Sequence, residues 1–85
     1  NNPDNNVFNV FNIELNCYVV VELKLRSLRK EDKAQMEFYM KLVDEQVKKP
    51  FHNRTIGIII TKESEKFIIN FVKEDDIIPL YYELQ

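Results

Sequence analysis

Residues 17–25 read Cys-Tyr-Val-Val-Val-Glu-Leu-Lys-Leu, and this stretch decides the fold. Its valine-rich apolar start favours a buried β-strand, because β-branched side chains pack well on a pleated surface. Side chains alternate between the two faces of a strand, so Glu22 and Lys24 point to one side and Leu23 to the other. Charges at the end of a buried strand cost free energy unless they pair or bind something. We expect the two to share a solvent-reachable site, which is the geometry that metal-dependent phosphodiester cleavage needs.

Length and composition limit what the chain can be. Eighty-five residues, 45% hydrophobic and 31% charged, make one small globular domain at most. No apolar run is long enough to span a membrane, and no secretory signal pattern stands at the start. Cys17 is the only cysteine, so an intrachain disulfide is impossible and a reducing cytoplasm is the expected location.

The order of elements predicts an α/β (α+β) domain with a mixed sheet. Residues 1–6 are a ragged polar start, and residues 7–85 form the single domain. Strands are expected at residues 7–13, 17–25, 55–61, 66–72 and 77–84, with one helix at residues 29–48. The order is therefore strand, strand, helix, strand, strand, strand.

Local signals fix how these elements connect. The first two strands should form an antiparallel hairpin, and the helix is long enough to make the strands on either side of it parallel neighbours. Ser27 is the expected helix cap. A stripe at helical spacing should face the core, formed by Met36, Tyr39, Met40, Val43 and Val47. Pro79 should keep the last strand at an edge of the sheet.

Four blocks in this order resemble a known family. They are residues 17–25, Gln35-Met36-Glu37-Phe38-Tyr39, Asp44-Glu45-Gln46-Val47-Lys48 and Ile56-Gly57-Ile58-Ile59-Ile60. The chain resembles the PD-(D/E)XK nuclease superfamily, and more specifically the C-terminal nuclease domain of the YhcG-like proteins of bacteria. The resemblance implies a restriction-endonuclease-like core and covers the chain from about Phe11 onward.

The resemblance implies site roles that agree with local chemistry. Glu22 would bind a divalent metal, Mg²⁺ or Mn²⁺, with the backbone carbonyl of Leu23 as a further ligand. Lys24 would position the attacking water or the phosphate. Gln35 and Tyr39 lie one helical turn apart and would border the site. The alternatives are a surface amide for Gln35 and core packing for Tyr39.

One expected residue is missing. The family carries a metal-binding Asp about fifteen residues before the Glu, where this chain has Val7, with Asn9 nearby. Asp4, in Pro3-Asp4, is either a second metal ligand or a turn residue. Residues absent near the start, or an inactive copy of the domain, would equally account for the missing acid. The family's preceding helix is also missing, so we expect a fragment of a longer protein with an upstream domain.

Basic residues gather after the charge pair. Arg26, Arg29 and Lys30, together with Tyr39, are candidates for substrate binding, and the expected partner is DNA. His52, the only histidine, is expected at the surface rather than in catalysis. Tyr81 and Tyr82 either stack on bases or pack along the edge strand.

Three functions remain open from the sequence. The first is a metal-dependent DNA endonuclease domain, in which Glu22, Lys24 and Gln35 are catalytic. The second is a catalytically degenerate nuclease-fold module for DNA binding or complex assembly, which the missing acid motivates. The third is a small regulatory domain unrelated to nucleases. A homodimer is possible through the apolar last strand.

Overall fold

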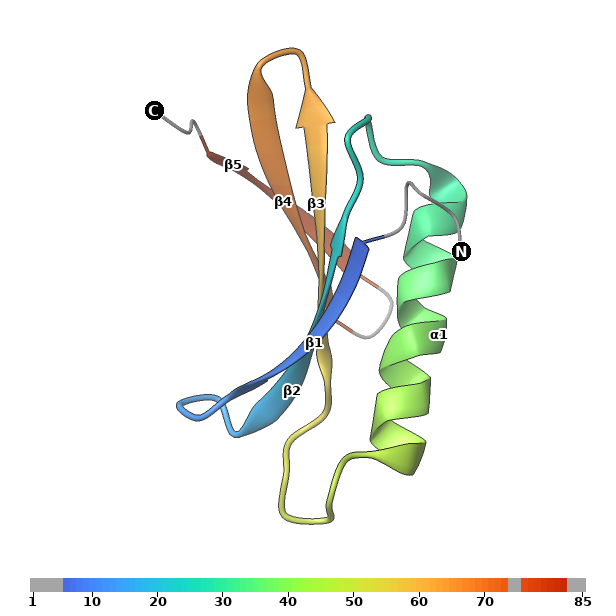
Figure 1. Cartoon of the computed structure of the whole chain (residues 1–85), viewed down its shortest axis with the longest axis vertical. Coiled ribbons are helices and arrows are strands. Elements are labelled where there is room, and N and C mark those ends of the chain that lie inside the picture. The colour runs from blue at the N-terminus through green and yellow to red at the C-terminus, as the bar shows by residue number, and fades with distance from the viewer. Residues whose placement is uncertain (1–5, 74–75, 83–85) are drawn as a thin grey trace.

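The computed structural model describes residues 6–73 and 76–82, with side chains for residues 6–73. Within these residues, five strands form one sheet in sequence order, and one helix lies on one side of it (Figure 1). The elements are β1 (Asn6–Asn12), β2 (Cys17–Leu23), α1 (Lys30–Gln46), β3 (Ile56–Glu63), β4 (Lys66–Lys73) and β5 (Asp76–Tyr82). Asn6 is therefore the first residue of β1 rather than part of the polar start, and Asp4 lies outside the described residues.

The sheet is mixed, as the sequence predicted. β1 and β2 form an antiparallel hairpin, and β2 and β3 are parallel because α1 carries the chain back between them. Asp44 fastens the end of this crossover, since its Oδ1 accepts hydrogen bonds from the Thr55 amide at 3.0 Å and the Thr55 hydroxyl at 2.6 Å. β3, β4 and β5 continue as antiparallel neighbours, and β5 lies at the edge with Pro79 in it.

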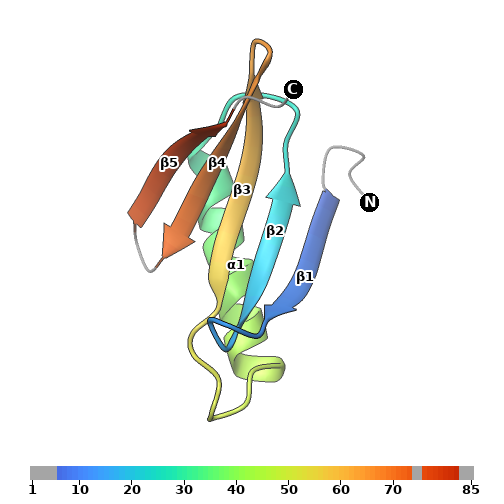
Figure 2. The ribbon, with the colours of Figure 1, turned by 90° about the vertical axis from the view of Figure 1, so that its left-hand side faces the viewer.

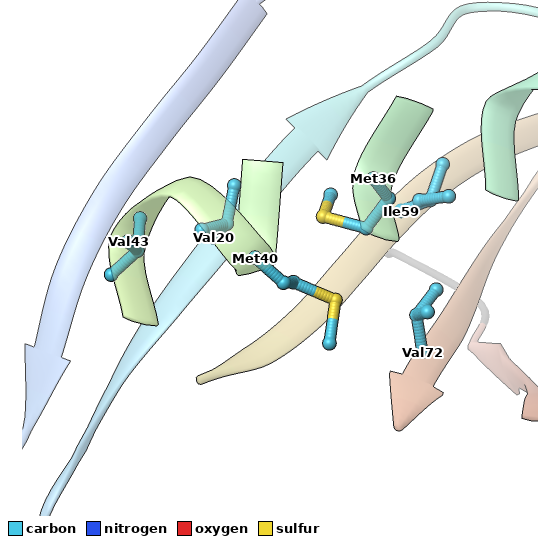
Figure 3. Packing of buried hydrophobic residues seen from close by; sticks show 6 residues of the cluster. All are labelled: Val20, Met36, Met40, Val43, Ile59 and Val72. Atoms are coloured by element: carbon cyan, nitrogen blue, oxygen red, sulfur yellow. The ribbon is translucent and has the colours of Figure 1, made fainter. Parts of the chain in front are cut away.

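The core lies between α1 and the sheet. It is formed by Val20, Met36, Met40, Val43, Ile59 and Val72 (Figure 3). Gly57 lets α1 approach closely, because a Cβ atom at this position would lie 2.6 Å from Met36 Cγ and 2.7 Å from Met40 Sδ. The two methionines fill the space that a side chain at position 57 would occupy.

Two expectations about α1 were wrong. The N-cap is Arg29 rather than Ser27, because Asp32 reaches back and accepts a hydrogen bond from the Arg29 amide at 2.7 Å. Val47 does not belong to the core stripe, because the helix ends at Gln46 and Val47, its C-cap, is exposed. The rest of the stripe is confirmed as buried or half-buried.

The observed architecture confirms the predicted fold class. The sheet lies to one side of α1 and the helix runs along β2 and β3 (Figure 2). Within the described ranges, no helix is both long enough and apolar enough to cross a membrane.

Candidate active site

The pairing of β2 with β3 places Glu22 on the face of the sheet that α1 covers. Val20 stands beside Gly57 and Glu22 beside Ile59 in the parallel pairing of β2 with β3. Because alternate residues share a face, Glu22 lies on the same side as Val20, which packs against α1. Lys24 follows on this side, one residue past the end of the strand, and its amide donates a hydrogen bond to the Ile60 carbonyl at 2.8 Å.

Glu22 and Lys24 form a buried ion pair. Lys24 Nζ lies 3.6 Å from Glu22 Oε2, and the side chains of Lys24 and Glu22 are 5% and 0% exposed. Neither carboxylate oxygen of Glu22 accepts a hydrogen bond from the described residues. Burial raises the pKa of Glu22, the nearby Lys24 ammonium opposes that rise, and the charge of Asp32 adds to it. Both oxygens of this buried carboxylate can therefore still accept hydrogen bonds or bind a cation.

A second, stronger ion pair lies beside the first. Arg26 Nη1 and Nη2 donate to Asp32 Oδ2 and Oδ1, both at 2.8 Å, in the bidentate geometry that guanidinium groups make with carboxylates. Asp32 is buried, and the hydrogen bonds from Arg26 are the largest cause of its lowered pKa. The Arg29 amide also donates to this carboxylate, so both oxygens of Asp32 already have donors.

The sequence analysis missed the place of Asp32 in the site. A usable signal was present in its spacing, since Asp32 lies four residues before Met36 and eight before Met40. Residues four apart share a face of a helix, so Asp32 continues the buried stripe toward the charge pair.

A comparison with family profiles decides which family the chain belongs to. The profile of the YhcG PDDEXK nuclease domain matches residues 7–82. The chain belongs to this family. Searches of curated proteins and of solved structures found no match.

The buried carboxylates of this YhcG nuclease domain differ in how well they could bind a divalent metal ion. PD-(D/E)XK nucleases generally use such ions, and the unbonded oxygens of Glu22 are suitable ligands. Asp32 is unsuitable while Arg26 and the Arg29 amide hold both of its oxygens. Within residues 6–73, no group of three acidic, histidine or cysteine side chains could hold a metal. The described residues thus supply one carboxylate for a metal, with Leu23 as the adjacent backbone donor.

The strand before the Glu-Leu-Lys sequence carries no acid. Val7 stands directly opposite Glu22, and Asn9 stands opposite Val20 on the same face. The residue that faces the carboxylate across the hairpin is therefore apolar, in agreement with the count along the sequence. Asp4, the remaining candidate for a second acid, falls outside the described part of the chain.

The other predicted site residues differ in how far their side chains are exposed. Gln35 and Tyr39 are half-buried on α1, and Tyr39 packs against the core cluster. Arg29 and Lys30 are exposed at the start of α1. Arg26 is half-buried through its bond to Asp32. The substrate-binding roles of these residues stay predictions.

Solvent access to the pair differs from the expectation. Glu22 and Lys24 are buried, and they line neither of two hollows on the described surface. One hollow lies between α1 and the start of β3 beside Asp44 and Thr55, and the other lies at the turn between β3 and β4. The charge pair is brought together as predicted but is enclosed rather than open.

The side chains of the single histidine and the single cysteine pack against other parts of the fold. His52 is half-buried against the rings of Phe11, Tyr18 and Phe51, and its Nδ1 accepts a hydrogen bond from the Lys49 amide at 3.1 Å. Cys17 is buried in β2, and burial raises the pKa of its thiol. The side chains of Tyr81 and Tyr82 lie outside the described residues.

Proposed function

We propose that this nuclease-fold domain is a metal-dependent DNA endonuclease whose reaction centres on Glu22. The observation that carries the proposal is the buried carboxylate of Glu22 next to the Lys24 ammonium. The resemblance to the family implies that this carboxylate is a metal ligand. A buried carboxylate with one ammonium nearby and no close hydrogen bond is stabilised by a cation or by a proton. Burial raises the pKa of this carboxyl group, which favours its protonated form over the charged one.

Each residue near the pair has a distinct proposed role. Glu22 and the Leu23 carbonyl would hold Mg²⁺ or Mn²⁺, and such an ion activates a water molecule and neutralises charge on a phosphate. Lys24 would orient the attacking water and donate to a phosphate oxygen. Gln35 would help to orient the water from the facing helix. Asp4 would supply a second carboxylate.

Substrate contact is assigned to the surface at the start of α1. Arg29 and Lys30 are exposed there, and lysine and arginine contacts to phosphates supply most non-specific affinity for DNA. Arg26, whose charge acts on Glu22, and Tyr39 would contact the scissile region. We also propose that the domain acts in the cytoplasm, since its buried thiol needs no oxidising compartment. The resemblance to the family further suggests that the domain is part of a longer chain with an upstream domain.

Cleavage of plasmid and linear duplex DNA tests the proposal. The protein is incubated with Mg²⁺, Mn²⁺ or a chelator, and Glu22→Gln and Lys24→Ala are compared with the parent. Each variant should lose about 100-fold or more in rate because each removes a group that acts on the reacting phosphate. Glu31→Gln, which neutralises an exposed acid in the first turn of α1, is the matched control and should cut like the parent. Cutting by both site variants at the parental rate would refute the assignment.

A second candidate function has specific support. Arg26 already binds the carboxylate of Asp32, and β1 contains no acidic residue. The described residues therefore offer one carboxylate as a metal ligand, that of Glu22, and it is enclosed in a buried ion pair. These features favour a catalytically degenerate nuclease fold that binds DNA or assembles a complex. Calorimetry distinguishes the two candidates, because a degenerate domain should take up neither Mg²⁺ nor Mn²⁺ at millimolar concentration. Salt-dependent DNA binding without metal uptake would identify a DNA-binding module.

A further inference from the structure

The outer edge of β1 lacks the features that usually protect an edge strand. Its sequence is Asn-Val-Phe-Asn-Val-Phe-Asn, without a charge, a proline or a glycine. Seven consecutive residues pair with β2 in unbroken register, so no bulge in this pairing turns the edge away. Natural edges are commonly blunted by lysine, proline or a bulge, since a regular unpaired edge can bind another strand. The opposite edge of the sheet, β5, contains Pro79.

Apolar side chains of β1 are exposed on both faces of the sheet. Val7 and Phe11 lie on the helix side, where α1 packs over β2, β3 and β4 rather than over β1. Phe8 and Val10 lie on the other side and are 57% and 51% exposed. Figure 2 shows β1 at the margin of the sheet, where β2 is its neighbour among the described strands. Two exposed apolar rows along one uncharged edge indicate a strand that pairs with a partner.

The sequence of β1 is complementary to itself when it is reversed. About a two-fold axis at Asn9, an antiparallel copy places Asn9 opposite Asn9, Phe8 opposite Val10 and Val7 opposite Phe11. Every apolar residue then meets an apolar residue, and each asparagine meets an asparagine. We propose that β1 is a homodimerisation strand, which pairs antiparallel with β1 of a second copy through this register.

The chemistry of the pairing favours a second copy over another partner. Aromatic side chains opposite β-branched ones stabilise antiparallel strands, and this register produces such pairs on both faces. The strand carries no charge that would select a charged segment. A two-fold axis perpendicular to the sheet also keeps both α1 helices on one side of the joined sheet. This edge differs from the last strand, at which a dimer contact was expected from the sequence.

Cysteine cross-linking tests the register directly, in the 85-residue chain with Cys17→Ser. Directly opposed residues in antiparallel strands have Cα atoms about 4.5–5.5 Å apart, within reach of a disulfide. Asn9→Cys alone should therefore form a covalent dimer under mild oxidation. Phe8→Cys alone should cross-link poorly, because its own copy is a diagonal neighbour at about 7–8 Å. A mixture of Phe8→Cys with Val10→Cys should restore cross-linking.

Charge substitution at the axis supplies an independent test. Sedimentation equilibrium of the parent should show a monomer–dimer equilibrium. Asn9→Lys and Asn9→Asp should each weaken it about tenfold or more, because like charges would face each other. Mixing the two variants should restore a heterodimer. Glu14→Gln changes the net charge as much as Asn9→Lys does, at an exposed turn residue, and should dimerise like the parent.

Three results would overturn the proposal. The first is a parent that stays monomeric at every concentration at which it remains dissolved. The second is a dimer that both Asn9 charge variants leave intact. The third is equal cross-linking of Phe8→Cys and Asn9→Cys. Circular dichroism spectra of the variants confirm that the sheet is formed, and neither test depends on nuclease activity.

Discussion

Lys24 Nζ lies 3.6 Å from Oε2 of Glu22 inside the protein, and neither oxygen of Glu22 accepts a hydrogen bond from the described residues. Removing charges from water is expensive, and an ion pair offsets that cost only with good geometry and further hydrogen bonds. The Glu22 carboxylate has a counter-charge and lacks those hydrogen bonds. The pair is therefore expected to lower the free energy of unfolding.

Loss of the lysine should be strongly destabilising. Lys24→Met removes the counter-charge of Glu22 and leaves a buried carboxylate uncompensated, which should lower the free energy of unfolding at pH 7 by about 3–5 kcal/mol. Urea denaturation measures the change. The double variant Glu22→Gln/Lys24→Met removes both charges and should recover most of the loss. Equal destabilisation by the single and double variants would show that the two charges do not interact.

The raised pKa of Glu22 predicts a particular pH dependence. A carboxyl group whose pKa is higher in the folded than in the unfolded state stabilises the fold fully below its unfolded pKa and loses this contribution as the pH rises through its folded pKa. Relative to Glu22→Gln, the parent should therefore lose free energy of unfolding as the pH rises above the usual pKa range of glutamate. Urea denaturation at a series of pH values from about 4 to about 8 measures this slope. A slope of the opposite sign would contradict the assigned shift.

Asp32 should behave in the opposite way. Its lowered pKa means that its contribution is present above the unfolded pKa and is lost as the pH falls through the folded pKa. Asp32→Asn should lower the free energy of unfolding at pH 7, measured by urea denaturation, by about 1.5–3 kcal/mol, because charge-assisted bonds to Arg26 and the Arg29 amide are lost. The deficit should shrink in strong acid. Glu31→Gln, an exposed neighbour, should change stability by only a few tenths of a kcal/mol, about the size of a surface dipole effect.

Most of the fold followed from periodicity. The valine-rich run before Glu22 and the helical spacing of Met36, Met40 and Val43 were enough to place β2, α1 and the parallel crossover. The helix cap was missed because Asp32 competes with Ser27 from within the first turn. That competition depends on tertiary burial next to Arg26, which local propensity does not encode.

The site was only half predictable. Strand alternation placed Glu22 and Lys24 on one side, and the structure brings them together. Enclosure of the pair and the second ion pair of Arg26 with Asp32 depend on how the start of α1 packs on the sheet. A charged residue has the same local pattern whether its partner is water or another side chain, so the sequence could not separate a solvent-facing Asp32 from a buried one.

Gly57 supplies a final prediction, about the contact between α1 and the sheet. Its φ is not positive, so alanine fits the backbone, but the added Cβ would lie 2.6 Å from Met36 Cγ and 2.7 Å from Met40 Sδ. Gly57→Ala should lower the free energy of unfolding by about 1–3 kcal/mol through overpacking. In a double-mutant cycle, Met40→Ala should cost less in the Gly57→Ala background than in the parent, because the new methyl group fills part of the space that the methionine leaves. Strict additivity of the two substitutions would show that Met40 does not pack over Gly57.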